Sequence, residues 1–478
     1  MIPKKAQKTQ RIRDPIHDEI VFDQGEPFDM SAWPLVDTAE LQRLRRIKQL
    51  GVSEFVYPSA THTRFAHSLG VFHNARRLIG LIQREFKLGR VQGELNEKRA
   101  KVAVLAAMLH DIGHGPFSHA FEEARRAIAE PRAGRDSVRE KIRKHEKFSG
   151  EMISNPASNI GSILTDIGVT PEEVSELIEA ETPSDMYHAI VSSSFDADRL
   201  DYLLRDRYMT GVGTGAIDLE WLMDNVRVAD LDVSPPGKEG GESIYTYSFC
   251  LFHKAREAAE DFLLARYRLY SNVYFHKTTR GLEQLVAALF RTIAEDVACG
   301  IHTKGLGSDH PLVAFFSKGG ETLANYLALD DAVVWGAVHQ IAAKGEGYPQ
   351  SIARRLITRD KPFCLDVQVA FPEEPEKQRR LKHKLGQQFR EQIGKTVFPD
   401  TARLSLYGEI GGDDARAQQR LMIQLSTGTL NEITSFMNRT ITSTTTDRLF
   451  ERYYFLDESL RAQAETAVDE TRRHRRHP

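Results

Sequence analysis

The sequence has few of the features that mark secreted or membrane-spanning proteins. It contains only 3 cysteines in 478 residues, Cys250, Cys299 and Cys364, and they lie far apart without a CxxC pair. This excludes a disulfide framework and a cysteine zinc site, and it predicts a reducing, cytoplasmic setting. No stretch approaches the ~18 consecutive apolar residues of a membrane helix, and the basic N-terminus runs into no signal-peptide core. We therefore expect no association with a membrane.

The chain also has almost no net charge. Its 64 Lys and Arg against 67 Asp and Glu leave a formal charge of −3, so any site for a polyanion must be local. The short basic ends, KKAQKTQRIR (4–13) and RRHRRH (472–477), leave open a nucleic-acid-binding protein or nuclease. No motif that interleaves aromatic and basic residues accompanies them, so this alternative is not favoured. Hydrophobic residues make up 41% of the chain, which is enough for a packed core.

Hydrophobic periodicity predicts a mainly α protein, in which a helical bundle is followed by a smaller α+β region. Apolar residues at helical spacing predict helices over 37–50, 68–87, 101–111, 185–208, 254–270 and 282–293. Asp37 is placed to cap the first of these helices. The run KVAVLAAMLHD is apolar on all sides, as expected for a helix inside a bundle, and it delivers His110 and Asp111 to the interior.

Changes in pattern divide the chain into four expected segments. These are a polar lead with short strands (1–36), a helical catalytic core (37–310), an α+β region (311–460) and a charged tail (461–478). Apolar pieces of strand length in the third segment lie at 367–371, 404–410 and 421–426. Two charged or turn-rich stretches, 122–147 and 230–243, are predicted to be loops.

The string AAMLHDIGHGPFSH contains most of the residues that suggest chemistry. His110 and Asp111 end the buried helix, and His114 lies about one turn further on. Upstream, His67 begins an amphipathic helix, and downstream Asp198 lies on a half-apolar one. Each residue alone has an ordinary structural explanation, but the ordered set predicts a metal site. Imidazole and carboxylate ligands without thiolates suit Fe, Mn, Ni or Zn with open positions, which implies bound water and hydrolysis.

Two arginines near this set suggest an anionic ligand. Arg266 falls within the apolar stripe of KAREAAEDFLLARYRLY, so it is expected to point inward, where a phosphate is a natural partner. An internal arginine–carboxylate pair is the alternative. Arg199 adjoins Asp198 and would reach a phosphate near the metal, with a surface salt bridge as its alternative.

The sequence resembles the HD-domain phosphohydrolases, and within them the deoxynucleoside triphosphate triphosphohydrolases. The matching strings occur in order: DPIHDEIVFD (14–23), DTAELQRLRRIKQLG (37–51), FVYPSATHTRFAHSLGVFHNA (55–75), LHDIGHGPFSH (109–119), HEKFSGEMI (145–153) and DADRLDYLLRD (196–206). The resemblance implies that the metal ligands are His67, His110, Asp111 and Asp198.

The resemblance also implies roles in catalysis and substrate binding. His114 and His145 would be active-site histidines near the scissile phosphate, and Asp111 would help to position the nucleophile. If His145 is instead a surface residue, the acid role passes to His114 or His119. The residues implied to hold the triphosphate and sugar are Gln49, Leu50, Arg64, His119, Arg199, Tyr202 and Arg266.

A regulatory nucleotide site at subunit interfaces is implied as well. The residues that match it are Asp37, Gln42, Arg45, His276 and Lys277. Helix capping by Asp37 and a solvated face at Gln42 and Arg45 are the ordinary alternatives. The residues before the DPIH string depart from the family, so the identity of an activator, and the need for one, stay open. Such a site predicts a homo-oligomer, either a dimer or a tetramer.

Together these features predict a metal-dependent enzyme that hydrolyses dNTPs to deoxynucleoside and inorganic triphosphate. Its expected cofactor is Fe, Mn, Ni or Zn, with Mg²⁺ as an additional cation on the substrate phosphates. In this interpretation a metal-activated water attacks the α-phosphorus, arginines hold the phosphate charge, and a histidine protonates the leaving 5′-oxygen. Two alternatives remain: an HD-type nucleotidase or phosphodiesterase acting on other nucleotides, and a nucleic-acid-binding protein or nuclease.

Overall fold

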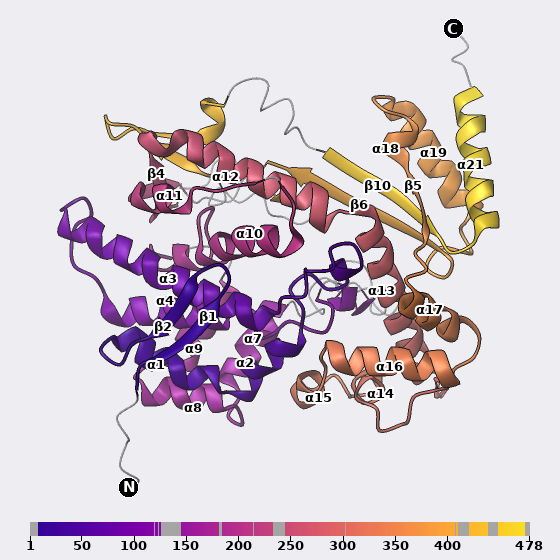
Figure 1. Ribbon diagram of the computed structural model, residues 1–478, viewed down its shortest axis with the longest axis horizontal. Helices are drawn as coiled ribbons and strands as arrows, with labels where there is room; N and C mark the ends of the chain where they lie inside the picture. Colours follow the sequence, from indigo (N-terminus) through magenta and orange to yellow (C-terminus); the bar gives the residue numbers. More distant parts are fainter. Residues whose placement is uncertain are drawn as a thin grey trace.

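The computed structural model describes most of the chain and is mainly α, as predicted (Figure 1). The described residues are 8–118, 120–122, 124–125, 145–180, 184–213, 215–232, 244–301, 303–406, 408–409, 420–437 and 448–473. His119 and most of the two predicted loops therefore lie outside the described residues. Within the described part, no helix has both the length and the hydrophobicity needed to cross a bilayer.

An antiparallel hairpin of β1 (Gln10–Asp14) and β2 (Asp18–Phe22) opens the fold and is followed by α1 (Pro27–Val36). The predicted helix over 37–50 is wrong, because α2 spans only Ala39–Arg43 and a 3-10 turn, η1 (Leu44–Arg46), ends the helical segment. Asp37 does not cap α2: it terminates α1, and the Thr38 hydroxyl accepts the Leu41 N–H instead. The chain then becomes extended, so that Lys48 pairs with Thr63.

The bundle is built around α3 (Arg64–Lys87) and α4 (Glu97–Leu109), close to the predicted positions. Helix α3 begins earlier than predicted because the Thr63 side chain caps it, and every residue from Val102 to Leu109 in α4 is buried. Helices α7 (His145–Ser154), α8 (Asn159–Asp166) and α9 (Pro171–Glu179) pack nearby. Against α3 lies α10 (Ala197–Thr210), capped by Asp196 and preceded by the 3-10 turn η4 (His188–Ile190), so the predicted helix over 185–208 starts later than expected.

A small sheet follows the bundle, and of its four strands only the one inside the predicted piece 421–426 was expected. It has the order β3 (Val226–Asp232), β4 (Tyr245–Phe252), β8 (Met422–Gln424) and β9 (Leu430–Glu432), with β4 and β8 parallel. Because β3 continues to Asp232, the loop predicted from 230 starts too early. Helix α12 (Arg256–Leu269) packs on β4, on α10 and on the short helix α11 (Leu219–Asp224). The next helix, α13 (Lys277–Ala298), packs instead against the last part of the chain.

The last part of the chain combines helices with a second sheet, as predicted. The helices α14 (Pro311–Phe316), α15 (Leu323–Leu327), α16 (Asp331–Lys344) and α17 (Gly347–Thr358) precede a sheet of order β5 (Phe363–Asp366), β10 (Arg448–Phe455), β6 (Val397–Ser405) and β7 (Gly408–Glu409). The strand predicted at 367–371 is wrong, because the Asp366 carboxylate caps the short helix α18 (Val367–Ala370). The main hydrophobic core contains residues on both sides of position 310, and the division into domains there stays a prediction.

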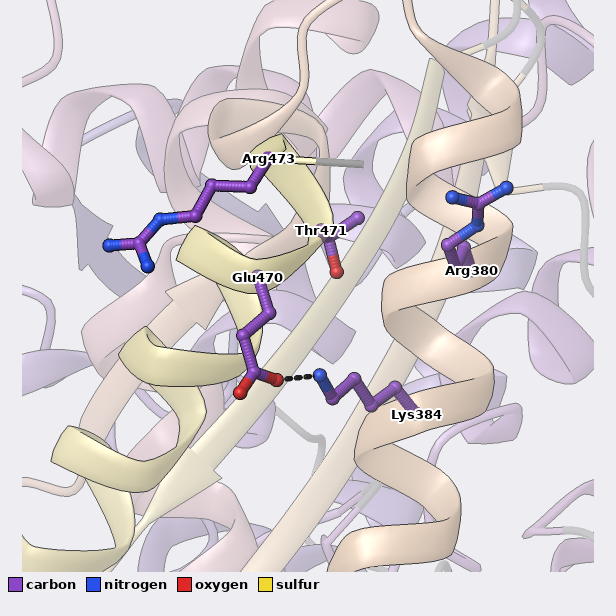
Figure 2. A pocket seen from close by; sticks show the side chains of 5 residues that line it. All are labelled: Arg380, Lys384, Glu470, Thr471 and Arg473. Atoms are coloured by element: carbon purple, nitrogen blue, oxygen red, sulfur yellow. Dashed lines mark hydrogen bonds and ion pairs between the residues drawn. The ribbon is translucent and has the colours of Figure 1, made fainter. Parts of the chain in front are cut away.

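The assignment of 461–478 to a charged tail is wrong for residues up to 473, which belong to α21 (Glu458–Arg473). The physical reason is a stripe of small residues at helical spacing, buried toward α19 (Pro375–Gln388): Ala464, Ala467, Val468 and Thr471. Figure 2 shows an open cleft between these two helices, lined by Arg380, Lys384, Glu470, Thr471 and Arg473. Lys384 and Glu470 form an ion pair across it, which links the two helices.

Candidate metal centre and its surroundings

The structure brings the four predicted ligands together from separate helices. His67 lies in the first turn of α3, His110 and Asp111 directly follow α4, and Asp198 lies in the first turn of α10. His67 Nε2 is 3.0 Å from Asp198 Oδ1 and 3.9 Å from Asp111 Oδ2. His110 Nε2 is 3.1 Å from Asp111 Oδ1 and 3.9 Å from Asp198 Oδ1. The four side chains therefore face one small volume.

The hydrogen bonds of both histidines suit a metal ion in that volume. His67 Nδ1 is 2.7 Å from Asp201 Oδ2, and His110 Nδ1 is 2.8 Å from the Ala107 carbonyl. Donation from Nδ1 leaves Nε2 of each neutral ring with a lone pair directed at the carboxylates. His67 Nε2 is buried and makes no well-aligned hydrogen bond in the described residues. Burial lowers the pKa of His67, but Asp198 and Asp201 outweigh it and raise the pKa to about 10. The two carboxylates thus favour a positive charge at this ring, which either a proton or a metal ion on Nε2 would supply.

A guanidinium group holds the central carboxylate. Arg64 Nη1 is 2.5 Å from Asp111 Oδ2, and Arg64 Nε donates to Ser118 Oγ at 3.0 Å. Burial raises the pKa of Asp111, but the charge of Arg64 opposes it and helps to hold the pKa well below its usual value. Asp111 is therefore a carboxylate at neutral pH. Arg64 itself, predicted to bind substrate, lies beside the site.

Two stacked histidines lie on the other side of Asp111. The rings of His114 and His145 have centroids 3.8 Å apart, His114 Nε2 is 3.3 Å from Asp111 Oδ1, and His145 Nδ1 is 3.1 Å from Glu122 Oε1. Burial lowers the pKa of His145, but Glu146 and Glu122 raise it to about 9. Burial and nearby positive charges hold the pKa of His114 well below its ordinary value. At neutral pH the pair therefore consists of one charged and one neutral ring, and His145 is not the surface residue that the alternative required.

The loop after α4 is held by residues from distant parts of the chain. The Phe117 N–H donates to Asp331 Oδ1 at 2.8 Å, and the Tyr326 hydroxyl donates to the Gly113 carbonyl at 2.7 Å. Phe117 has a φ of +53°, a left-handed conformation that such contacts must maintain. A Cβ at Gly113 would lie 2.1 Å from the His145 carbonyl oxygen, so only glycine lets α7 approach this closely. The geometry of the loop thus depends on contacts from both sides.

The predicted phosphate-binding residues form a second group next to the donor set. Arg266 is 5% exposed, and its Nε has no partner. Arg266 forms no ion pair with any carboxylate of the described residues. The internal ion pair considered as an alternative is therefore absent there. Arg199, in contrast, pairs with Asp196, although its Nε is also buried without a partner. Burial raises the pKa of Tyr202, while Arg266 and Arg199 act on it in the opposite sense, so the phenol lies near both cations.

The other two described residues that were predicted to bind substrate are Gln49 and Leu50. Gln49 donates its backbone N–H to the His62 carbonyl at 3.0 Å, and its side-chain Oε1 is buried without a partner. Leu50 is half-buried against the main core. Gln49 and Leu50 directly follow Lys48, which pairs with Thr63, the residue before α3. The pairing therefore places them near the N-terminal end of α3.

The predicted regulatory residues make mostly local contacts. Arg45 donates to Gln42 Oε1 at 2.8 Å and lies over the Phe65 ring at 3.6 Å, and His276 caps α13. Asp37 and Lys277 are exposed. These contacts leave the regulatory assignment a prediction.

Sequence reasoning missed several residues that contact the predicted site, among them Asp201 and Glu122. Asp201 binds His67, and Glu122 binds His145. A signal for Asp201 did exist, because it lies three positions after Asp198 on the face of α10 that is otherwise apolar. Glu122 carried no comparable signal.

Comparison with known proteins identifies the family. Residues 64–206 match the HD domain, the segment that contains all four donor residues. The chain is also 30% identical over 358 residues to the uncharacterised protein YwfO of Bacillus subtilis, covering 74% of this chain and 71% of that protein. The chain belongs to the HD-domain phosphohydrolases.

Further similarities place it near relatives with a named activity. It is 33% identical over 267 residues, 53% of this chain, to the deoxynucleoside triphosphate triphosphohydrolase SAMHD1 homolog of Dictyostelium discoideum, and it spans only 45% of that protein. A crystal structure of a phosphohydrolase from Bacteroides thetaiotaomicron shares the fold, with a TM-score of 0.69 and 24% identity over 93% of this chain and 98% of that chain. The predicted membership of the dNTP triphosphohydrolase branch agrees with these similarities.

Proposed function

We propose that the protein hydrolyses deoxynucleoside triphosphates to deoxynucleoside and inorganic triphosphate. The observation that carries this proposal is the buried guanidinium of Arg266, which has no carboxylate partner in the described residues and lies near Tyr202, next to Asp198. An unpaired buried cation beside a donor set for a metal ion calls for an anionic ligand with several charges. The similarity to proteins named as dNTP triphosphohydrolases supports the same substrate class.

His67, His110 and Asp111 lie close enough together to hold a metal ion, and Asp198 adjoins them through His67. These donors suit a divalent transition metal, namely Fe, Mn, Ni or Zn, with Mg²⁺ as a further cation on the substrate phosphates. When bound, such an ion would polarise a phosphate oxygen and lower the pKa of water at the site. The residues in this proposal are His67, His110, Asp111 and Asp198.

The chain's own residues would divide the remaining work. Arg64 orients the Asp111 carboxylate, which in turn aligns the attacking water. Arg266 and Arg199 neutralise the triphosphate, and Tyr202, Gln49 and Leu50 contact the substrate. Charged His145 donates a proton to the leaving 5′-oxygen, a role that contributes typically 10²- to 10⁴-fold. Neutral His114 holds Asp111 from the opposite side.

A product assay tests this proposal directly. Purified protein is incubated with each of the dNTPs and rNTPs, and the products are resolved by anion-exchange chromatography, with the His110→Ala protein as the inactive control. We expect inorganic triphosphate and deoxynucleoside in equal amounts. Stepwise release of single phosphates would favour the nucleotidase alternative. In a parallel incubation with single-stranded nucleic acid, cleavage of the strand would favour the nuclease alternative.

We also propose a regulatory site in a homo-oligomer, either a dimer or a tetramer. Its residues are Asp37, Gln42, Arg45, His276 and Lys277, and the exposed cations Arg45 and Lys277 support binding of a nucleotide activator.

The free state of Cys250, Cys299 and Cys364 supports a cytoplasmic location.

A further inference from the structure

The carboxylate of Asp201 is fully buried beside the donor set and accepts hydrogen bonds from three side chains. Its Oδ2 faces His67 Nδ1 at 2.7 Å and Arg205 Nε at 2.8 Å. Its Oδ1 faces His17 Nε2 at 2.7 Å and Arg205 Nη2 at 2.8 Å. These contacts match the four acceptor positions of a carboxylate, so Asp201 has a single allowed orientation.

The N-terminal hairpin supplies part of this network. Asp14, at the end of β1, accepts hydrogen bonds from Arg205 Nη1 at 2.7 Å and Nη2 at 3.2 Å, and His17 lies in the turn between β1 and β2. The side chains of His17 and Asp201 are 3% and 0% exposed, and those of Arg205 and Asp14 are 1% and 5% exposed. Such a network is stable only when every member is paired, because an unpaired buried charge is costly.

The sequence of α3 makes room for the network. Gly70 lies one turn after His67, and a Cβ at that position would lie 1.8 Å from Asp201 Oδ1 and 2.6 Å from Arg205 Nη2. Gly70 lies within a helix, where glycine is unfavourable by ~1 kcal/mol relative to alanine. Its role here is therefore steric: it allows the carboxylate to reach the ring of His67.

We infer that Asp201 is the positioning residue of the metal centre, and that the β1–β2 hairpin fixes it through His17 and the Asp14–Arg205 pair. This inference rests on the donor set in the proposed function, but not on the substrate or the reaction. By accepting a hydrogen bond from the Nδ1–H group, Asp201 fixes the tautomer and the ring plane of His67 and makes its Nε2 a stronger donor to a cation. Loss of such an outer partner typically weakens metal affinity 10- to 100-fold.

Metal affinity, measured apart from activity, tests the inference. Full-length apoprotein is titrated with Co²⁺ in the presence of a competing chelator, and the visible spectrum of the bound ion reports on its ligand geometry. Asp201→Asn should weaken Co²⁺ binding about 10- to 100-fold and alter the spectrum. The matched control is Asp400→Asn, because Asp400 is also buried and also binds an arginine, Arg280, through both oxygens, but far from the donor set.

Three further variants separate positioning from folding. His17→Ala should weaken Co²⁺ binding, and His17→Gln should restore part of the affinity because its side-chain amide can still donate to Asp201. Gly70→Ala should displace Asp201 without changing any ligand, and should give the same spectral change as Asp201→Asn.

The outcomes distinguish this inference from the proposed function. Wild-type affinity and spectrum in the folded Asp201→Asn protein would overturn the inference. An equal loss in Asp400→Asn would also overturn it, since the effect would then be one of general stability. If the wild-type protein binds Co²⁺ and Asp201→Asn binds it weakly, but no dNTP is hydrolysed, the inference stands and the proposed function fails.

Discussion

Replacing Arg266 by methionine should separate the role of its charge from the role of its packing. Methionine keeps much of the aliphatic stem and removes the guanidinium, which has no carboxylate partner in the described part of the chain. If the guanidinium binds the triphosphate through charge-assisted hydrogen bonds, its loss should cost about 2–3 kcal/mol in kcat/KM, or about 30- to 150-fold. Lysine should restore only part of this, because its point charge lacks the two-pronged geometry of arginine.

Thermal unfolding of the same variants gives a control. Arg266→Met should unfold at the wild-type Tm or above it, since no carboxylate loses a partner. Arg43 is equally buried but donates to the carbonyl groups of Leu329, Ile112 and His114. Arg43→Met should therefore lose about 1–3 kcal/mol of stability for each carbonyl left unpaired. An Arg266→Met enzyme with unchanged kcat/KM for every dNTP would refute the reasoning.

Three other predictions concern the metal, the proton donor and the regulatory site. The double variant His110→Ala, Asp111→Ala should lose bound metal and all hydrolysis while keeping its helical circular dichroism; full activity after metal depletion would contradict the site. The kcat should fall as pH rises through about 9, where His145 loses its proton. Because Glu122 helps to raise the pKa of His145, Glu122→Gln should move this fall in kcat to lower pH. A fall that stays at the same pH would assign the titration to another group. Arg45→Ala should abolish activation by any nucleotide that is not consumed and should weaken oligomers in sedimentation, whereas a monomeric wild-type enzyme without such a response would remove the regulatory proposal.

How much the sequence could predict depended on the range of the interactions. Helices α3 and α4 were predicted because their stripes of apolar residues are local patterns. Asp37 was misassigned because a neighbouring hydroxyl, that of Thr38, competes for the same cap. The tail was misread because its charges are obvious in the sequence, while the small-residue stripe around Ala467 is meaningful only once α19 is in place.

The same distinction applies to the candidate site. The donor residues were visible because His110 and Asp111 are adjacent and end an apolar helix. The contacts of Asp201 were not visible, because they join residues separated by 134 and 184 positions in the chain. Periodicity cannot detect pairs at that separation, although the family strings did contain His17 within DPIH.

The contacts of Tyr326 and Asp331 with the loop after α4 have a consequence for how this enzyme can be divided and how it can diverge. Both residues lie well outside the segment 64–206 that matches the HD domain, yet they hold the backbone of Gly113 and Phe117. A fragment trimmed to the matched segment would retain every donor side chain, but it would lose the two contacts that hold the loop after α4 in place. We therefore expect substitutions at Tyr326 or Asp331 to alter the loop in this chain without changing any motif residue, and a graft of the motif onto another helical bundle would have to include both contacts.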